Sequence, residues 1–502
     1  MTDTPLMLFN SLTRKLEPFD PVHPGEAPDF VAEARVYTCG PTVYNYPHIG
    51  NMRAYVFADV LGRTLSFKGY QLKHVINITD VGHLTDDADA GEDKLEQAAK
   101  ANAQSIWEIA KHYTEAFWAD IKALNIRQPM KWSIATDYVP AMIEFAKGIA
   151  AEHCYELEGG LYFDTSTVAN YGRLARAQTD EGEGRIQAVD GKRNAADFAI
   201  WRKTSPGESR QMEWDSPWGR GAPGWHLECS VMSGQLLGFP FDIHTGGIDH
   251  REIHHPNEIA QNQAHCRSDA SGANIWMHNN FLVERSGKMS KSSGEFLRLQ
   301  LLIDRGYHPL AYRMMCLQAH YRSELEFSWE GLGAALVRLK RLVKAIEKLR
   351  GDIDVKKIER KLDSSLISTL AVLRIPVSEE VESFEWFVEQ DLNTAAALVT
   401  FEEAVGLAGP SVDWAIDALT AALYMDRVLG LNLAKLTRAD LRIRPKSATI
   451  TEPEIDAILT RRKVARAAKD FATSDALRDQ LAAHSVEVMD GDPLGWDWKL
   501  SG

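Results

Sequence analysis

Apolar and polar residues alternate with two different periods near the start of the chain, and this change of period predicts a strand, a helix and a second strand. Residues 35–39 (Arg-Val-Tyr-Thr-Cys) are β-branched and aromatic, which predicts a strand. Apolar residues at helical spacing over 54–65 predict a helix that Gly69 can end, and the apolar run 72–78 predicts a second, parallel strand. Such a unit belongs to an open α/β sheet that is buried on both faces.

The same arrangement returns further along the chain, after an interruption. Residues 241–244 predict a strand, residues 254–266 a helix and residues 275–283 another strand. The interruption is about 150 residues long, the size of one domain, and apolar residues at helical spacing over 106–124 predict that it begins with a helix. We therefore expect one parallel sheet whose two halves are separated by an inserted domain.

The pattern becomes helical after residue 325. Apolar residues step by three and four over 332–346, which predicts a long helix with a basic outer face. Such a face usually contacts solvent and less often nucleic acid. A basic segment at about 454–483 follows Pro453 and predicts a last helix before a short tail rich in Gly and Trp. The predicted fold class is therefore α/β, followed by a helical region.

The composition is that of a globular protein with room for about three domains, because 45% of the 502 residues are hydrophobic and 25% are charged. No apolar run approaches the ~20 residues that span a bilayer, and the N-terminus lacks the apolar segment of a signal peptide. These features exclude a disordered or fibrous chain. They predict a cytoplasmic protein with no membrane partner.

Charge and cysteine usage narrow the classes of partner. The formal net charge of −14 argues against a sequence-independent coat on nucleic acid or anionic membrane, although it leaves room for a local basic face. Five cysteines in so long a chain are few, and their number is odd. This usage is typical of a reducing compartment, where thiols serve packing, metal binding or catalysis.

Two short motifs contain residue types that bind phosphate. His48 and Asn51 lie where the first predicted strand leads into its helix, where free N–H groups and the helix dipole attract anions, and Gly50 between them leaves room for a base or ribose. A helix cap with an incidental histidine would explain this string equally well. Lys288 and Lys291, in the string Lys-Met-Ser-Lys-Ser, could hold a leaving pyrophosphate, or could lie in an ordinary solvated loop. The two motifs together are more specific than either alone.

A third set of residues has the chemistry of a metal site. His254 and Glu258 share a helical face, and both are ordinary zinc ligands. The string from His250 to His254 is not the zinc-protease motif, because arginine stands where that motif needs glutamate. A His/Glu pair alone is more often a surface contact, so thiols must complete the site. Cys229 and Cys39 are the best placed of the five cysteines, although spacing alone does not select them.

The chain resembles the cysteinyl-tRNA synthetases, which are class I aminoacyl-tRNA synthetases, from about residue 6 to the C-terminus. The resemblance is carried by residues 37–51, 77–80, 192–194 with Asp197, Phe198 and Trp201, 216–219, 224–229, 242–244 and 288–292. The strings within 37–51 and 224–229 are specific to cysteine-activating members. The motifs around His48 and Lys288 occur throughout the class.

The resemblance implies a Rossmann-like parallel-sheet catalytic domain with an inserted connective domain, followed by a helical bundle and a small C-terminal anticodon-binding domain. The expected boundaries are 1–120 and 221–303 for the two catalytic halves, 121–220 for the connective insertion, 304–450 for the stem-contact region and bundle, and 451–502 for the C-terminal domain. The sequence does not give the oligomeric state, and a monomer is the expectation we adopt.

The activity that the resemblance implies has two steps. L-Cysteine is activated by ATP, with Mg²⁺, to cysteinyl-adenylate and pyrophosphate, and the cysteine then passes to the 3′ end of cysteine tRNA. His48 and Asn51 would stabilise the phosphates, and Lys288 and Lys291 would hold the pyrophosphate. The other implied ATP contacts are Gly50, Gly247 and Asp249, with Lys291.

The resemblance further implies one Zn²⁺ per chain, held by Cys39, Cys229, His254 and Glu258. Zinc prefers sulfur, so the thiolate of the substrate could join the metal, and the hydroxyl of serine could not compete. A polar partner of this kind can discriminate by roughly 10⁴-fold without editing. The implied residues of the cysteine pocket are Gly40, Thr79 and Trp225.

Arg466, Asp475 and Asp490 match the positions at which the family reads anticodon bases, in a segment whose residues 461–484 hold six bases and three acids. The chain departs from the family's patterns at three places. Asn51 replaces the second histidine of the first motif, Pro256 lies between the two zinc ligands of the helix, and residues 293–295 differ after the lysine motif.

Two other functions remain open at this point. One is a ligase that joins cysteine to an amino sugar through the same adenylate, for which a terminal basic helix would have no use. The other is a catalytically silent RNA-binding relative, which the intact lysine motif and zinc set disfavour.

Overall fold

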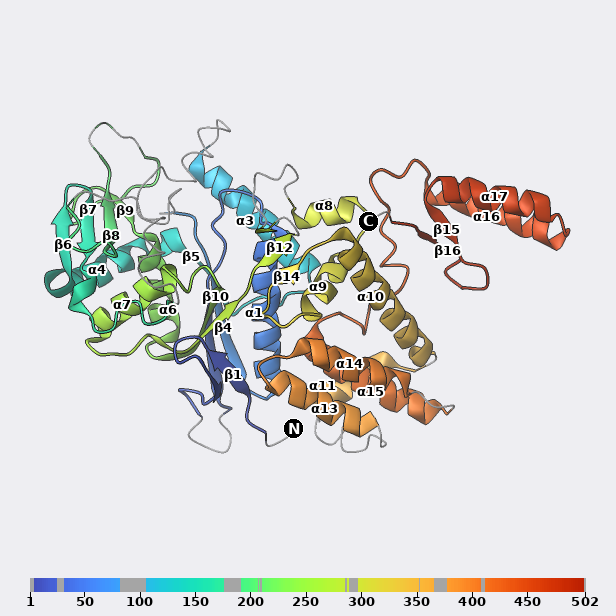
Figure 1. Ribbon diagram of the computed structural model, residues 1–502, viewed down its shortest axis with the longest axis horizontal. Coiled ribbons are helices and arrows are strands. Elements are labelled where there is room, and N and C mark those ends of the chain that lie inside the picture. The colour runs from blue at the N-terminus through green and yellow to red at the C-terminus, as the bar shows by residue number, and fades with distance from the viewer. Residues whose placement is uncertain are drawn as a thin grey trace.

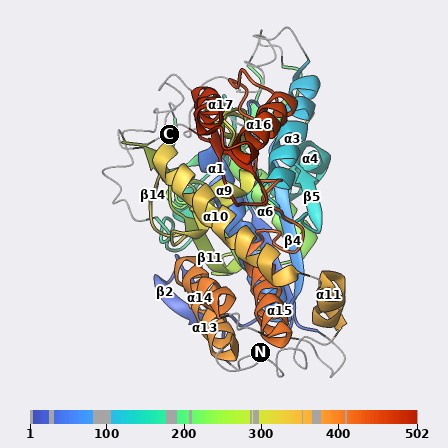
Figure 2. The same ribbon diagram turned by 90° about the vertical axis from the view of Figure 1, so that its right-hand side faces the viewer.

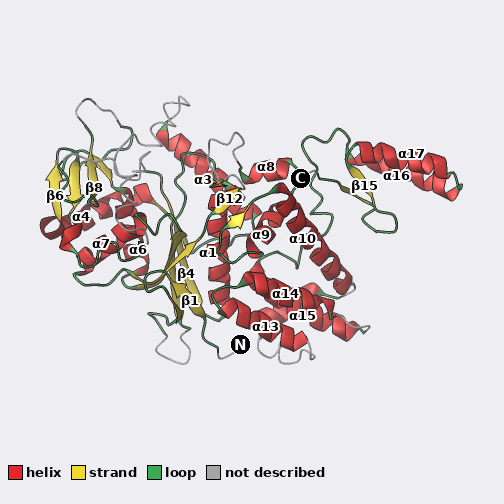
Figure 3. Ribbon diagram, viewed as in Figure 1, coloured by secondary structure: helices red, strands yellow, loops and turns green. Residues whose placement is uncertain are grey.

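A five-stranded parallel sheet lies at the centre of the computed structural model, with a smaller sheet on one side and helices on the other (Figure 1; Figure 3). The structure describes residues 4–24, 31–81, 105–175, 191–205, 207, 210–284, 287–288, 297–351, 353–364, 377–407 and 411–500. None of the helices in these ranges combines the length and the apolar character that crossing a bilayer requires.

The central sheet has the strand order β11-β10-β3-β4-β5, and all of its pairs are parallel. Its strands are β3 (Glu33–Thr38), β4 (Gln71–Ile78), β5 (Lys131–Ile134), β10 (Phe241–Gly247) and β11 (Ala273–Asn279). The chain builds outward from β3 in one direction and later from β10 in the other. The expected α/β class is therefore confirmed, with a point between β3 and β10 at which the strand order reverses.

Helices cover both faces of this sheet, as the sequence predicts. α1 (Ile49–Phe67) packs on one face, and α6 (Trp225–Leu237) and α7 (His254–Cys266) lie on the other (Figure 1). α1 ends at Lys68, where Gly69 takes a positive φ of 92° that glycine adopts without strain. α3 (Ile106–Ala123) begins at a Ser105 capping box.

The insertion has an antiparallel sheet of its own, in the order β6-β7-β8-β9. Its strands are β6 (Cys154–Leu157), β7 (Gly160–Phe163), β8 (Phe198–Lys203) and β9 (Gly221–Pro223), which follow α4 (Val139–His153). β5 falls within the expected insertion 121–220 but belongs to the central sheet. We therefore propose that the connective unit proper starts after β5.

The helical region after residue 303 is a group of helices that pack on one another, and two of them, α9 and α15, contact α1. Its longer helices are α9 (Pro309–Leu317), α10 (Trp329–Arg350), α11 (Val355–Ser364), α13 (Val377–Glu389), α14 (Thr394–Gly406) and α15 (Val412–Leu429). The remaining short elements of the chain are β1 (Met7–Asn10), β2 (Lys15–Pro18), β12 (Leu282–Glu284), β13 (Gly287–Lys288), α8 (Leu299–Asp304), β14 (Leu325–Glu326) and two 3₁₀ turns, Ala135–Tyr138 and Thr165–Thr167.

The C-terminal unit projects from the rest of the molecule and has a small core of its own (Figure 1). It contains α16 (Glu452–Ala467), α17 (Phe471–Ala483), β15 (Val486–Val488) and β16 (Trp496–Trp498). In Figure 2, α16 and α17 lie at one end of the face that α10 crosses, and α13, α14 and α15 lie at the other.

The single basic helix expected at about 454–483 is wrong, because the structure has two helices there. Lys469 takes a positive φ of 59°, which ends the first helix, and the backbone N–H of Thr473 donates to Asp470 Oδ1 at 3.1 Å, which starts the second. The basic periodicity runs through this turn without a break. Only the capping chemistry of Asp470 marks it in the sequence.

The basic face of α10 is largely occupied by ion pairs within the chain. Lys340 and Lys344 pair with Asp497 (2.5 Å) and Asp492 (2.9 Å) of the C-terminal unit. Arg338 pairs with Glu402 of α14 at 2.8 Å. These contacts explain much of the basic face without nucleic acid.

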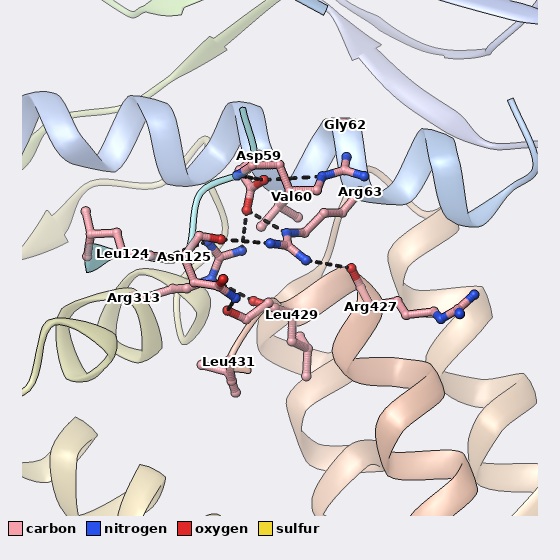
Figure 4. Close-up of polar contacts among 12 residues, drawn as sticks. Asp59, Val60, Gly62, Arg63, Leu124, Asn125, Arg313, Arg427, Leu429 and Leu431 are labelled. Carbon is pink, nitrogen blue, oxygen red and sulfur yellow. Dashed lines mark hydrogen bonds and ion pairs between the residues drawn. The ribbon is translucent and has the colours of Figure 1, made fainter. Parts of the chain in front are cut away.

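A buried carboxylate joins the helical bundle to α1 (Figure 4). Asp59 of α1 accepts hydrogen bonds from Arg63 and from Arg313 of α9, both at 2.7 Å, and from the backbone N–H of Arg127 at 3.0 Å. Burial raises the pKa of Asp59, but the charges of Arg313 and Arg63 outweigh it and hold the pKa at about 2. Asp59 is therefore a permanent anion at neutral pH.

Arg313 extends this junction to the ends of two other helices. Its guanidinium donates to the carbonyls of Leu124 (3.1 Å), after α3, and Leu429 (2.8 Å), the last residue of α15, where helical carbonyls lack partners within the helix. Gly430 follows with a φ of 63°, and a Cβ there would lie 2.5 Å from the Arg313 guanidinium. The close approach of the end of α15 to Arg313 thus requires glycine at position 430.

Replacing Asp59 by asparagine leaves Arg313 buried without its counter-charge, so we expect Asp59→Asn to lose about 3–5 kcal/mol of stability. The shift of the first transition in urea unfolding measures this loss. Glu144→Gln, which removes an exposed pair with Lys147, is the control, with an expected change below about 1 kcal/mol. Equal shifts in the two variants would contradict the assignment.

Candidate active site

The strand ends around the reversal point enclose a cavity of about 420 Å³. Its wall is formed by segments that follow β3, β4, β10 and β11 and by the starts of α1, α6 and α7. The cavity brings together most of the site residues that the sequence predicts: Cys39, Gly40, His48, Gly50, Asn51, Thr79, Trp225, Cys229, Gly247, Asp249 and His254.

The four predicted metal ligands meet on one side of this cavity. Cys39, Cys229, His254 and Glu258 are buried, and one ligand atom from each lies within 4.8 Å of all the others. The Cys39 Sγ is 4.0 Å from the Cys229 Sγ and 4.0 Å from Glu258 Oε1, and His254 Nε2 is 3.0 Å from the same oxygen. Two sulfurs, one nitrogen and one oxygen fit a zinc ion.

Local structure explains why these four side chains converge. Cys39 directly follows β3, and Cys229 lies in α6 on the far side of the crevice. His254 is the first residue of α7 and Glu258 follows one turn later, so both side chains lie on one face. Pro256 falls in the first turn of α7, where it removes no helical hydrogen bond.

Two further histidines belong to this cluster, and the sequence analysis did not single them out. His244 Nε2 lies 2.9 Å from Glu258 Oε2, and His255 Nε2 lies 3.4 Å from the Cys39 Sγ. Cys39, His244, His255 and Glu258 also meet the geometric criterion for a metal site. A histidine within a buried strand, such as His244 in β10, was the available signal.

Charges of both signs lie close together around these ligands. Burial raises the pKa of Glu258, but His244 and His254 outweigh it and hold it at about 2. Burial also opposes ionisation of the Cys39 thiol, yet its contacts with Cys229 and His255 lower its pKa well below the ordinary value. The hydrogen bond with Cys39, together with burial, raises the pKa of Cys229. The cluster therefore concentrates negative charge at Cys39 and Glu258, which suits a cation.

The start of α1 forms one end of the cavity, and its two polar side chains cap each other's backbone. The Gly50 N–H donates to His48 Nδ1 at 3.0 Å, and the His48 N–H donates to Asn51 Oδ1 at 3.2 Å. The string from His48 to Asn51 therefore does form the helix cap that we considered as an alternative explanation for it. The Asn51 side chain uses its oxygen in this cap, so its amide N–H groups point to a role as donors at the helix N-terminus.

The predicted cysteine-pocket residues are held by Asn77 at the end of β4. The Gly40 N–H donates to Asn77 Oδ1 at 2.7 Å, and Asn77 Nδ2 donates to Thr79 Oγ1 at 3.0 Å. A Cβ on Gly40 would lie only 1.5 Å from the Asn77 carbonyl oxygen, so this position admits only glycine. The Trp225 ring packs against His254 with centroids 4.1 Å apart.

The lysine motif is described only in part. The backbone of Lys288 pairs with Val283 of β12, and Leu282 of the same strand lines the cavity. Lys291 lies outside the described residues. The expected contact of the two lysines with pyrophosphate therefore stays a prediction from the sequence.

Two of the three predicted anticodon residues form an ion pair in the C-terminal unit. Arg466 lies 2.6 Å from Asp490, and the buried Arg462 holds the same carboxylate with two contacts of 2.6 and 2.7 Å. Asp475 lies on the neighbouring helix, 3.6 Å from Arg478. Arg462 is absent from the sequence prediction, because nothing in the helical pattern pairs it with a residue 28 positions away.

Two family models match this chain. One, described as the tRNA synthetases class I (C) catalytic domain, matches residues 29–336, and the other, the cysteinyl-tRNA ligase anticodon binding domain, matches residues 451–493. The methionyl-tRNA synthetase of Mycobacterium tuberculosis, solved with methionyl-adenylate, superposes with a TM-score of 0.51 at 16% identity. The superposition covers 82% of this chain and 92% of the methionyl-tRNA synthetase chain, which shows that the two share a fold.

Curated relatives match the chain over its whole length. A cysteine–tRNA ligase of Novosphingobium aromaticivorans is 71% identical, and the match covers 99% of this chain and 97% of that protein. A cysteine–tRNA ligase of Zymomonas mobilis is 52% identical, with 99% and 98% covered. With the ligand cluster and the capped helix at one crevice, these matches establish that the chain belongs to the cysteine–tRNA ligase family of class I aminoacyl-tRNA synthetases.

Proposed function

We propose that this chain activates L-cysteine with ATP to give cysteinyl-adenylate and pyrophosphate, and then transfers the cysteine to the 3′ end of cysteine tRNA. The observation that carries this function is the meeting of a sulfur-rich ligand cluster and a helix N-terminus in one cavity. The first suits the thiol of the substrate, and the second suits the phosphates of ATP.

The selectivity for cysteine would come from one zinc ion held by Cys39, Cys229, His254 and Glu258. The donor set supports zinc, and so do the partners behind it. His226 Nδ1 lies 2.8 Å from His254 Nδ1, and His244 contacts the second oxygen of Glu258, so both ligands are oriented from behind. When bound, zinc supplies a soft position for the substrate thiolate. Gly40, Thr79 and Trp225 would form the rest of the pocket.

The side chains at the start of α1 would act on the phosphates of ATP. His48 and Asn51 offer donors there, next to the positive end of the helix dipole, and the reaction needs mainly positioning and charge stabilisation. Asn51 cannot carry the positive charge of a histidine, so its contribution is a neutral hydrogen bond. Gly50, Gly247 and Asp249 would contact the nucleotide, and Lys288 and Lys291 the pyrophosphate, with Mg²⁺ bound to ATP.

Transfer to tRNA would use the C-terminal unit 451–502, with Arg466, Asp475 and Asp490 at the anticodon. The anticodon-binding family model over 451–493 supports this role and disfavours the amino-sugar ligase. The five free thiols support a reducing location in the cytoplasm. We also propose that the chain acts as a monomer.

The activity is tested by exchange of labelled pyrophosphate into ATP in the presence of cysteine, and by acylation of cysteine tRNA. We expect exchange with cysteine but little with serine, because only the thiol matches the ligand cluster. Failure of exchange with cysteine would refute the proposal. Exchange without any acylation of tRNA would favour the amino-sugar ligase.

The zinc proposal is tested in Cys229→Ala, because loss of one thiolate should remove or greatly weaken the metal. We expect about one zinc per wild-type chain by metal analysis and much less in the variant, with reduced preference for cysteine over serine. Cys316→Ala, a buried thiol outside the cluster, is the matched control and should keep its zinc. Full zinc content and intact selectivity in Cys229→Ala would contradict the ligand assignment.

A further inference from the structure

ATP binding calls for positive charge, yet none of the described residues that line the cavity is a lysine or an arginine. Asp249 adds a negative charge to this lining, and Asn51 at the start of α1 is neutral. The triphosphate of ATP carries several negative charges, which a helix dipole alone balances only in part. A permanent cation beside the start of α1 would therefore favour its binding.

Arg53 of α1 does not supply this charge, because the fold already uses its donors. Its side chain is buried, and its guanidinium donates to the carbonyls of Asn280 at 3.0 Å and Ser323 at 2.5 Å. Asn280 follows β11 and Ser323 precedes β14, so Arg53 holds both segments on α1. Without it, these partly buried carbonyls would lose their hydrogen bonds. The role of Arg53 is therefore structural.

Arg298, which directly precedes α8, lies beside the start of α1 and is tied to it by two contacts. Its guanidinium carbon lies over the Tyr46 ring, 4.6 Å from the ring centre, as a cation–π pair. The carbonyl of the neighbouring Leu297 accepts the Ile49 N–H at 2.8 Å. Tyr46 lines the cavity two positions before His48, so the charge of Arg298 lies next to the helix cap.

The Tyr46 ring is a fixed support for this guanidinium, because α3 holds it from another side. The Tyr46 hydroxyl lies 3.0 Å from His112 Nε2, in hydrogen-bond contact. Its ring meets the Tyr113 ring edge-on, with centroids 5.0 Å apart. The ring therefore cannot turn freely, and the guanidinium above it has a defined place.

The Arg298 guanidinium has no hydrogen-bond acceptor and no ion-pair partner among the described residues. The acid whose pKa it lowers is Asp120 of α3. Burial nevertheless raises the pKa of Asp120 to about 7, so this carboxyl is only partly ionised near neutral pH. Arg298 therefore keeps both its charge and its donors for a ligand.

We propose that Arg298 is an ATP-binding residue that contacts the outer phosphates of ATP, and that Tyr46 is the positioning residue that holds its guanidinium. This inference builds on the proposed function, because it requires that the chain activates cysteine with ATP. A guanidinium presents its donors in a planar fork, which matches two phosphate oxygens at once.

The chemistry of activation explains why a cation is useful at this place. The carboxylate oxygen of cysteine bonds to the α-phosphorus, and the bond to the oxygen that bridges the α- and β-phosphates breaks, with its electron pair leaving on pyrophosphate. The attacking and leaving oxygens lie roughly in line. The pyrophosphate therefore leaves away from the cysteine, and Arg298 stabilises its growing charge.

The proposal is tested by cysteine-dependent exchange of labelled pyrophosphate into ATP with Arg298→Gln and Arg298→Lys. We expect Arg298→Gln to lower kcat/KM for ATP by roughly 10- to 150-fold, the factor for one lost hydrogen bond to a charged group, with an unchanged KM for cysteine. Arg298→Lys should recover part of this loss, because lysine keeps the charge but not the planar fork.

A non-hydrolysable analogue of cysteinyl-adenylate distinguishes a phosphate contact from a general structural role. The analogue has no β- or γ-phosphate, so its inhibition constant should be the same for the wild-type protein and Arg298→Gln. Tyr46→Leu removes the support of the guanidinium and should lower kcat/KM for ATP by a smaller factor than Arg298→Gln. Adding Tyr46→Leu to Arg298→Gln should cost little more, because the ring acts through the guanidinium.

Arg305→Gln is the matched control. Arg305 follows α8, and its guanidinium lies over the Trp329 ring, 4.0 Å from the ring centre, away from the residues that line the cavity. This variant should keep the wild-type kcat/KM for ATP. Its midpoint of thermal unfolding should match that of Arg298→Gln, because each variant loses one cation–π contact.

Three results would overturn the inference. The first is an unchanged kcat/KM for ATP in Arg298→Gln, and the second is an equal loss of affinity for ATP and for the adenylate analogue. The third is a raised KM for tRNA in acylation with unchanged exchange, which would assign the guanidinium to tRNA phosphates. Absence of exchange in the wild-type protein would instead refute the proposed function, and weaker ATP binding by Arg298→Gln in equilibrium dialysis would still support the phosphate contact.

Discussion

The reversal of strand order between β3 and β10 is the constraint on which the site depends. Because the chain leaves these neighbouring strands in opposite directions, no crossover covers their carboxyl ends, and a crevice remains there. Cys39 follows one strand, and Gly247 ends the other. α1 starts at this crevice from one face of the sheet, and α6 and α7 start at it from the other. The ligand cluster and the start of α1 therefore meet at one crevice.

Much of this arrangement can be predicted from local sequence signals, since strands, helix periodicity and caps are properties of short segments. The helix 254–266 and the shared face of His254 and Glu258 follow from spacing alone. The predicted strand end and the nearby Gly-Trp-His string made Cys39 and Cys229 the best-placed thiols, but spacing alone did not select them, because thiols 190 residues apart meet only through tertiary structure. His244 and His255 were missed for the same reason. The split of the last basic segment was missed because its periodicity continues through the turn.

Among the buried acidic groups of the described residues, Asp59 and Glu258 are both balanced by groups of opposite charge. Asp59 lies among arginines, and Glu258 lies among histidines. Pairs of this kind gain little net stability over apolar packing, but removing one partner is costly. They therefore fix geometry more than they stabilise the fold. The ion pairs of Asp59 fix how α1 docks against α9. The contacts of Glu258 fix how the ligand atoms of the cluster are oriented toward one another.

The start and the second half of α1 make different contacts, and because a helix is rigid, the two parts move together. His48 caps its start at the cavity, while Asp59 and Arg63 attach its second half to α9 and α15. Asp59 follows His48 by eleven positions, which corresponds to about 16 Å of rigid helix. A tilt of the bundle relative to the sheet would therefore rotate α1 and move its first turn, at His48, within the cavity. The junction at Asp59 is thus the pivot about which α1 would turn, and the part of α1 from Asp59 back to His48 would transmit this rotation to the cavity.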